Sequence, residues 1–125
     1  MQQRVAPKKW EIWWVDQVLA RAATSPYHQP GDPSDKDRMY LVVADPLGSN
    51  RITCCPLQDV GSGIGITEVE LPENYRGRVT SKSCKIICNE IYTFPKDYFY
   101  KRMGFLDRKK QEDVQTALIN FLELA

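Results

Sequence analysis

The sequence lacks the features that would place the protein in a membrane or outside the cell. It has no uninterrupted apolar run of about 18 residues, the length that favours a membrane span. Its N-terminus is polar and basic and then aromatic, without the apolar core and small-residue cleavage site of a secretion signal. Its net charge is only +1, so the total charge does not mark a binder of polyanions. We therefore expect a cytoplasmic protein with no membrane partner.

The motifs of a metal site are also missing. The four cysteines form no Cys-x-x-Cys knuckle, and the chain has a single histidine. Cys54 and Cys55 are adjacent in a predicted strand and should face opposite sides. Cys84 and Cys88 share a side but lie about 13 Å apart at the rise of a strand. We predict buried free thiols and no cofactor, with an assembled four-thiolate site or a redox bridge as the alternatives.

The length and composition predict one domain over residues 1–125. At 125 residues and 42% hydrophobic content, the chain can bury a substantial core but is too short for two domains. Gly61, Gly63 and Gly65 do not form a dinucleotide-binding fingerprint, because a predicted strand rather than a helix follows them.

Most of the chain is predicted to form short strands. Aromatic, β-branched and apolar residues favour strands over residues 10–18, 40–44, 51–57, 66–71 and 84–93, with Pro56 ending the third. Between the first two strands, residues 19–37 form a predicted loop, and a loop of this length is usually functional or disordered.

Two helices are predicted in the last third. Pro95 is expected to begin a short basic helix that Gly104 ends, and Asp107 is expected to cap a terminal amphipathic helix. One face of that helix carries its apolar residues, namely Val114, Ala117, Leu118, Phe121 and Leu122. The predicted fold is mainly β with α: a small, partly open barrel or twisted sheet with short helices and a C-terminal helix.

Charge is distributed unevenly along the chain. Basic residues predominate over residues 76–110, and acidic residues predominate over residues 39–75. If the basic residues share a face, that face can hold a phosphate backbone; the alternative is an ordinary solvated surface.

Four segments resemble, in order, the MazF/PemK toxins of bacterial toxin–antitoxin systems. They are residues 9–16 (KWEIWWVD), 37–44 (DRMYLVVA), 55–59 (CPLQD) and 83–124. The resemblance implies an SH3-like barrel and a symmetric homodimer with metal-independent endoribonuclease activity on single-stranded RNA, usually messenger RNA. It also implies a cognate antitoxin protein as a partner.

Such an enzyme needs no nucleophile of its own. The 2′-hydroxyl of the RNA attacks the neighbouring phosphorus, which leaves a 2′,3′-cyclic phosphate and a 5′-hydroxyl. The protein must then supply a proton acceptor, a proton donor and cations for the pentacoordinate phosphate.

Family likeness assigns the main cation to Arg38, which falls on the arginine of the family's Arg-Pro motif. A planar guanidinium that stays charged suits a phosphorane, and it is also the candidate proton donor. Glu11 stands where the family often has the aspartate of Gly-Asp, and Asp16 matches a second acidic position. Either carboxylate would orient Arg38 or simply end a strand. Without the resemblance, the sequence indicates only that Arg38 is an arginine at a strand edge, stacked or solvated.

The long loop and the basic segment supply further candidates. His28 is a proton shuttle near neutral pH, and the adjacent Tyr27 is a stacking platform for a base, unless both are merely exposed. The predicted RNA-binding residues are Asp16, Tyr27, Lys82, Lys101 and Arg102. Core or dimer contacts are the expected role of the aromatic residues Trp13, Trp14 and Tyr40.

Departures from the family pattern leave alternatives open. Gln58 replaces the Thr or Ser hydroxyl of the Pro-Leu-Thr-Ser motif, Met39 replaces the proline after the arginine, and Trp10 replaces the glycine of Gly-Asp. Gln58 can donate a hydrogen bond to a phosphoryl oxygen but cannot act as a hydroxyl.

The sequence therefore predicts a sequence-selective ribonuclease toxin in which Arg38 and Gln58 act with His28 or Glu11. The alternatives are a non-catalytic binding module, either a nucleic-acid binder or a CcdB-type gyrase inhibitor, and a structural thiol or zinc protein. CcdB-like proteins end in an exposed aromatic helix tip, whereas Phe121 is predicted on the apolar stripe.

Overall fold

The computed structural model describes residues 6–24, 36–61, 63–76 and 79–123. The strands in chain order are β1 (Glu11–Val15), β2 (Arg38–Val42), β3 (Arg51–Asp59), β4 (Glu68–Leu71), β5 (Cys84–Ile87), β6 (Tyr92–Pro95) and β7 (Phe99–Phe105). The helices are α1 (Gln17–Thr24), the 3₁₀ turn η2 (Lys96–Tyr98) and α2 (Arg108–Leu122).

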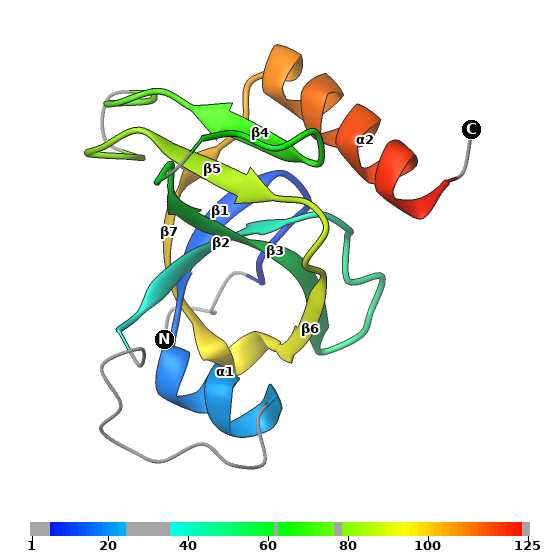
Figure 1. Ribbon diagram of the computed structural model, residues 1–125. Coiled ribbons are helices and arrows are strands. Elements are labelled where there is room, and N and C mark those ends of the chain that lie inside the picture. Colours follow the sequence, from blue (N-terminus) through cyan, green and yellow to red (C-terminus); the bar gives the residue numbers. More distant parts are fainter. Residues whose placement is uncertain (1–5, 25–35, 62, 77–78, 124–125) are drawn as a thin grey trace.

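The described strands form one bent antiparallel sheet of seven strands (Figure 1). Its order is β4-β5-β3-β2-β1-β7, with β6 paired to β3, and the two ends of the sheet do not join. Helix α2 lies beside β4, and α1 lies at the opposite end of the sheet. The prediction of a mainly β, partly open barrel with a C-terminal helix is confirmed. None of the described helices is long and apolar enough to cross a membrane.

Strand β3 is shared by three partners. Its residues 54–56 pair with β2, residues 51–54 pair with β6, and residues 57–59 pair with β5. The prediction that Pro56 ends this strand was wrong, because β3 continues to Asp59. Pro56 lies where one edge of β3 changes partner from β6 to β5, so neither of those two pairings requires its missing N–H.

The adjacent cysteines of β3 contribute to two separate cores. Cys55 packs in a cluster with Cys84 and Cys88 beneath α2, whereas Cys54 packs with aromatic residues on the other face. The predicted opposite orientation of Cys54 and Cys55 is confirmed, and all four thiols are buried and free. Burial raises the pKa of Cys84 to about 11 and the pKa values of Cys55 and Cys88 to about 12, so these thiols stay protonated at neutral pH.

The first predicted strand and loop need correction. Strand β1 ends at Val15, and α1 occupies residues that were expected to end the strand and begin the loop. The reason is Asp16, whose Oδ1 accepts the Leu19 N–H at 3.2 Å and so caps the first turn of α1. The predicted loop residues Tyr27 and His28 lie outside the described residues.

The region after Cys84 differs more from its prediction. The single strand expected over residues 84–93 is two strands, β5 and β6, separated by a turn that includes Asn89. The basic helix expected between Pro95 and Gly104 is wrong, because only η2 is helical and β7 follows it directly. Gly104 does not stop a helix: it lies inside β7, where a Cβ atom would come within 2.6 Å of Val79 Cγ2. Glycine is needed at this position because Val79 packs too close to the β7 backbone to leave room for a side chain.

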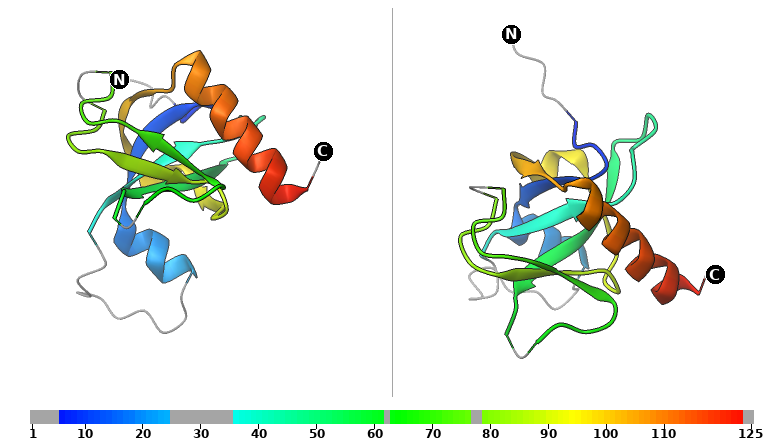
Figure 2. Two further views of the ribbon diagram at one scale, coloured as in Figure 1. Left: turned by 45° about the horizontal axis from the view of Figure 1, so that its top comes forward. Right: turned by 90° about the horizontal axis from the view of Figure 1, so that it is seen from above.

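The terminal helix is confirmed, but its apolar stripe is shorter than predicted. Val114 and Ala117 are buried, whereas Phe121 is 41% exposed and Leu122 is 48% exposed. Figure 2 shows the end of α2 extending beyond the strands. Phe121 therefore does not distinguish this chain from proteins with an exposed aromatic helix tip. The side chain of Asp107 accepts a hydrogen bond from the Tyr75 hydroxyl and does not cap α2.

Trp10 occupies a backbone conformation that glycine adopts more easily. Its φ is 75°, and a non-glycine residue in this region is strained by about 1 to 2 kcal/mol. Two backbone hydrogen bonds hold it there: its N–H donates to Val42 O at 2.8 Å, and its carbonyl accepts from Leu106 N at 2.9 Å. The fold thus holds a tryptophan, packed against the core, in a backbone conformation that glycine adopts more easily.

Lys85 is a buried lysine in the centre of β5, with 8% of its surface exposed. Its Nζ donates to the Glu68 carboxylate at 3.0 Å and to the Gly63 carbonyl at 3.0 Å. The Gly65 N–H, and then Lys85, hold the pKa of Glu68 below its usual value. The ion pair links β5 to β4 and compensates a charge that would be costly to bury alone.

We predict that Gly104→Ala destabilises the protein by about 1 to 3 kcal/mol, because the new methyl group overlaps Val79. Urea unfolding measures the loss. The same substitution in a Val79→Ala background is the control, since it removes the atom that clashes. An equal loss in both backgrounds would show that Val79 is not the cause.

We also predict that the Glu68 ion pair makes stability depend on pH. Because the pKa of Glu68 is lower in the folded than in the unfolded chain, its stabilisation is complete above the unfolded pKa of about 4.3 and is lost as the pH falls through the folded pKa. The free energy of unfolding of Glu68→Gln should therefore differ most from wild type above about pH 5 and converge on it as the pH falls through the lowered folded pKa of Glu68. Urea midpoints across this range measure the difference. The control Glu73→Gln, at an exposed position, should show no such convergence, and a constant gap for Glu68→Gln would contradict the prediction.

Candidate functional site

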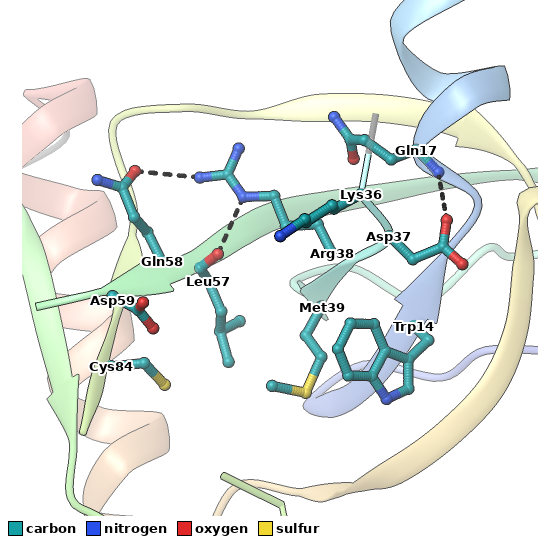
Figure 3. Close-up of a pocket in the computed structure, with 10 residues that line it drawn as sticks. All are labelled: Trp14, Gln17, Lys36, Asp37, Arg38, Met39, Leu57, Gln58, Asp59 and Cys84. Carbon is teal, nitrogen blue, oxygen red and sulfur yellow. Dashed lines mark hydrogen bonds between the residues drawn. The ribbon is translucent and has the colours of Figure 1, made fainter. Parts of the chain in front are cut away.

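A hollow of about 420 Å³ lies at the end of the sheet where β2 begins and β3 ends. Its volume is within the usual range of about 300 to 1,000 Å³ for small-molecule sites. Figure 3 shows the residues that line it, which are Trp14, Gln17, Lys36, Asp37, Arg38, Met39, Leu57, Gln58, Asp59 and Cys84.

Arg38 and Gln58, the two residues most strongly predicted for the site, meet in this hollow. The Arg38 Nε donates to Leu57 O at 3.0 Å, and its Nη2 donates to Gln58 Oε1 at 3.1 Å (Figure 3). Both contacts are to neutral acceptors, so they orient the guanidinium without neutralising its charge. Its remaining N–H groups have no partner among the described residues.

Asp37 ties the start of β2 to two other elements. One carboxylate oxygen accepts the Gln17 N–H of α1 at 3.1 Å, and the other accepts the hydroxyl of Tyr100 on β7. The backbone that carries Arg38 is therefore held from both sides. Asp37 acts as a positioning residue because both of its oxygens are occupied.

A second hollow, of about 320 Å³, adjoins the first. The two hollows share Trp14, Met39, Asp59 and Cys84 as common walls. The second continues along Val79, Thr80, Ser81, Lys82 and Met103. Lys82, a predicted RNA-binding residue, is exposed. It lines the second hollow, which shares walls with the hollow that contains Arg38.

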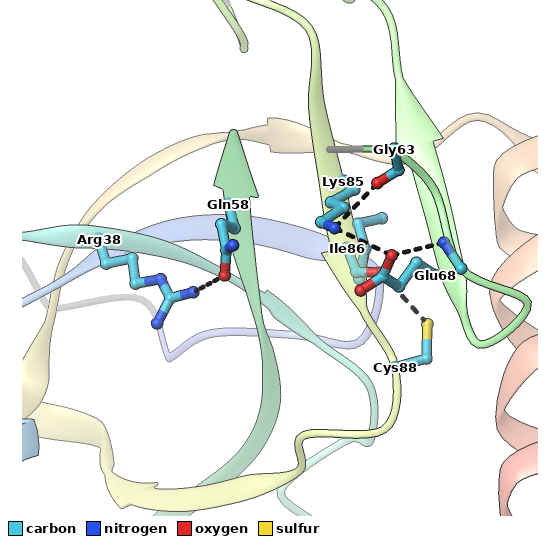
Figure 4. Close-up of polar contacts among 8 residues, drawn as sticks. Arg38, Gln58, Gly63, Glu68, Lys85, Ile86 and Cys88 are labelled. Carbon is cyan, nitrogen blue, oxygen red and sulfur yellow. Dashed lines mark hydrogen bonds and ion pairs between the residues drawn. The ribbon is translucent and has the colours of Figure 1, made fainter. Parts of the chain in front are cut away.

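Lys85 brings a further cation close to Gln58. The two residues are register partners on β5 and β3. Figure 4 shows them together with Arg38 and Glu68. Glu68 pairs with Lys85 at 3.0 Å and compensates its charge, whereas Arg38 has no carboxylate partner in the described ranges. Arg38 is consequently the better anion ligand of the two.

The other predicted site residues lie elsewhere. Glu11 is at the opposite end of β1 from Val15, the register partner of Arg38. Its carboxylate accepts from the Lys8 N–H, the Trp13 indole and Arg102, the last at 3.0 Å. The structure thus brings Glu11 and Arg102 together and keeps both apart from Arg38.

Two more predicted contacts have defined positions. Asp16 follows the last residue of β1 and caps α1, while its role in binding RNA stays a prediction. Lys101 is exposed on β7 and is the register partner of Trp14, beside the hollows but not lining them.

The basic segment does not form one uniform surface. On α2, Arg108 pairs with Glu112 at 3.6 Å and Lys109 with Asp113 at 2.8 Å. Arg76 lies over the ring of Phe105. Local partners therefore reduce the number of cations available to a phosphate backbone.

Sequence reasoning missed several lining residues. Lys36 and Asp37 immediately precede Arg38 in the chain, and that proximity was an available signal. Trp14 and Asp59 gave no comparable signal, since strand pairing brings them to the hollow: Trp14 is paired with Met39, and Asp59 with Cys84. In the described ranges, no three His, Cys, Asp or Glu side chains are arranged to hold a metal ion.

Solved structures share this architecture at low sequence identity. An endoribonuclease in complex with its cognate antitoxin, from mycobacterial species, has a TM-score of 0.69 at 15% identity, covering 96% of this chain and 98% of that chain. MazF from Deinococcus radiodurans also scores 0.69 at 15% identity, covering 96% and 99%. The Mycobacterium tuberculosis toxin MazF-mt6 scores 0.63 at 18% identity, covering 73% and 91%. At these identities the likeness shows the fold.

Sequence comparison identifies the family. No curated protein matches the chain. The model of a family described as PemK-like, MazF-like toxin of type II toxin-antitoxin system matches residues 8–122. Because that match spans nearly the whole chain, the protein belongs to the PemK-like, MazF-like toxins of type II toxin–antitoxin systems.

Proposed function

We propose that this protein is a sequence-selective endoribonuclease that cleaves single-stranded RNA, messenger RNA above all, without a metal ion. The observation that carries the proposal is the guanidinium of Arg38, which has no ionic partner among the residues that the structure describes and is oriented by Leu57 O and Gln58 in an open hollow. Membership of the toxin family and the likeness to structures named as endoribonucleases support it.

Arg38 and Gln58 hold the scissile phosphate. The 2′-hydroxyl oxygen attacks phosphorus while its proton passes to an acceptor, the bond from phosphorus to the 5′-oxygen breaks, and that oxygen receives a proton. The products are a 2′,3′-cyclic phosphate and a 5′-hydroxyl. Arg38 stabilises the charge that develops on the phosphoryl oxygens and is the candidate donor, while the Gln58 amide N–H₂ donates to one of them.

His28 remains the predicted proton acceptor. Glu11 is the weaker candidate, because its carboxylate already accepts from Lys8, Trp13 and Arg102 at the other end of β1. A carboxylate used in this way positions a neighbouring strand more readily than it removes a proton.

A homodimer and a cognate antitoxin are the proposed protein partners. Two structures of similar fold are described as a complex with a cognate antitoxin and as MazE–MazF. An acidic or amphipathic antitoxin tail would compete with RNA for Arg38. Light scattering should give the mass of a dimer, and addition of the antitoxin should suppress cleavage; a monomer, or cleavage that the antitoxin leaves unchanged, would contradict these assignments.

A non-catalytic binding module is the alternative function. Gln58 in place of a hydroxyl and the exposed Phe121 at the end of α2 favour it. Intact RNA together with impaired supercoiling by DNA gyrase would support the gyrase-inhibitor form of this alternative, and tight RNA binding without cleavage would support the nucleic-acid-binding form.

We predict that purified wild-type protein cleaves single-stranded RNA in EDTA and that Arg38→Ala lowers the rate at least about a thousandfold, because the charge on the phosphorane loses its main partner. Gel analysis of end-labelled RNA measures the rate, and the product ends show the cyclic phosphate. Arg51→Ala, at an exposed arginine on the far end of β3, is the matched control and should cleave normally.

Gln58 variants refine the same assay. Gln58→Ala should lose about tenfold to a hundredfold in rate, because both the phosphoryl hydrogen bond and the orientation of Arg38 are lost. Gln58→Thr should retain more activity by restoring the family's hydroxyl, and Gln115→Ala on α2 is the control.

Undiminished cleavage by Arg38→Ala would refute the assignment of the site.

A further inference from the structure

The two hollows form one groove whose shared walls come from paired strands. Trp14 of β1 and Met39 of β2 are register partners, and Asp59 of β3 and Cys84 of β5 are register partners. Trp14, Met39, Asp59 and Cys84 line both hollows, whereas Arg38 and Gln58 line only the first. The groove therefore changes from a cationic end to a wall that combines an indole, a thioether and a carboxylate.

Asp59 is unusual among the carboxylates of this region. It is exposed at the end of β3, and its carboxylate has no hydrogen-bond or ion-pair partner among the residues that the structure describes. By contrast, Asp37 has both oxygens occupied, and Glu68 is bound to Lys85. A free carboxylate beside a phosphate-binding arginine would repel a polyanion unless a ligand group donates hydrogen bonds to it.

The chemistry of this wall fits a nucleobase. Aromatic and thioether surfaces stack on the π-face of any base, whereas a carboxylate accepts only from N–H groups on a base edge. Guanine presents two neighbouring donors, N1–H and N2–H₂, that match the two carboxylate oxygens. Adenine and cytosine offer one amino group beside an acceptor, and uracil offers one N–H between two carbonyls that the carboxylate would repel.

We propose that the shared wall is a nucleobase subsite in which a base stacks on Trp14 and Asp59 reads its donor edge, with guanine preferred and uracil disfavoured. This inference rests on the proposed function for the location of the phosphate at Arg38. Lys82, which is exposed and lines only the second hollow, is then the candidate contact for the next phosphate of the strand. Asp59 is a specificity-determining residue in this arrangement.

Binding of uncleavable probes tests the subsite without relying on catalysis. The probes are short fluorescein-labelled 2′-deoxy strands with one guanine, adenine, cytosine or uracil between abasic positions, and fluorescence anisotropy gives their affinities. Wild type should bind the guanine probe about tenfold or more tightly than the uracil probe. Asp59→Asn preserves the side-chain shape and should abolish that preference, because an amide offers a donor where the carboxylate has an acceptor.

Two further variants separate the roles of the wall. Trp14→Leu keeps an apolar side chain and should weaken binding of all four probes about tenfold, since stacking is lost but the base edge is still read. Glu123→Gln makes the same change of charge at the end of α2 and should leave every affinity unchanged. Circular dichroism verifies that each variant is folded.

The outcomes distinguish the subsite from the ribonuclease function. Equal wild-type affinity for all probes, or an unaltered preference in Asp59→Asn, overturns the subsite even if the protein cleaves RNA. If Asp59→Asn loses cleavage but the variant keeps the base preference, Asp59 is a proton acceptor, and the proposed subsite is also overturned. Guanine preference in a protein that cuts no RNA would support the subsite and refute the proposed ribonuclease.

Discussion

The constraint on which the rest of the structure depends is the pairing of β3 with three strands. Strand β3 holds β6 along its first half and β5 along its second, and its side chains enter a core on each face, with Cys54 and Cys55 in succession. The change of partner falls at Pro56, where an N–H is dispensable. Beyond it, β3 ends beside the start of β2, so the same pairing that builds the sheet also places Gln58 against Arg38.

Some of the charged groups near this end of the sheet have partners of opposite charge or hydrogen-bond donors, and others do not. Lys85 is buried and tied to Glu68, and Asp37 is satisfied by α1 and β7, so both stabilise the scaffold without offering a strong site to a ligand. Within the described part of the chain, Arg38 and Asp59 have no ionic partner, and both line one hollow together with Lys36. Such an arrangement suits a ligand that carries both an anionic group and hydrogen-bond donors, as a nucleotide does.

Local patterns predicted the parts of the fold that local physics determines. The apolar content of β2 and the helical spacing of Val114 and Ala117 are visible in the sequence, and both elements were found. The misplaced elements depend on contacts distant in the chain. Gly104 is typical of a helix end until its packing against Val79 is known, and Asp59 is unremarkable until β5 brings Cys84 beside it. Arg38 and Gln58 were predicted from family resemblance, whereas the neighbours that shape their hollow come from strand register.

Gln58 holds the arginine through a neutral amide oxygen. A carboxylate acceptor would fix the guanidinium but cancel its charge, and a short hydroxyl reaches less far across to β2. The longer amide accepts from Arg38 at 3.1 Å through its oxygen and keeps an N–H₂ group for a ligand. Just before β1, packing and two backbone hydrogen bonds hold Trp10 in a conformation that glycine adopts freely. At both positions the contacts that the residue makes, rather than its identity alone, show what it does for the fold.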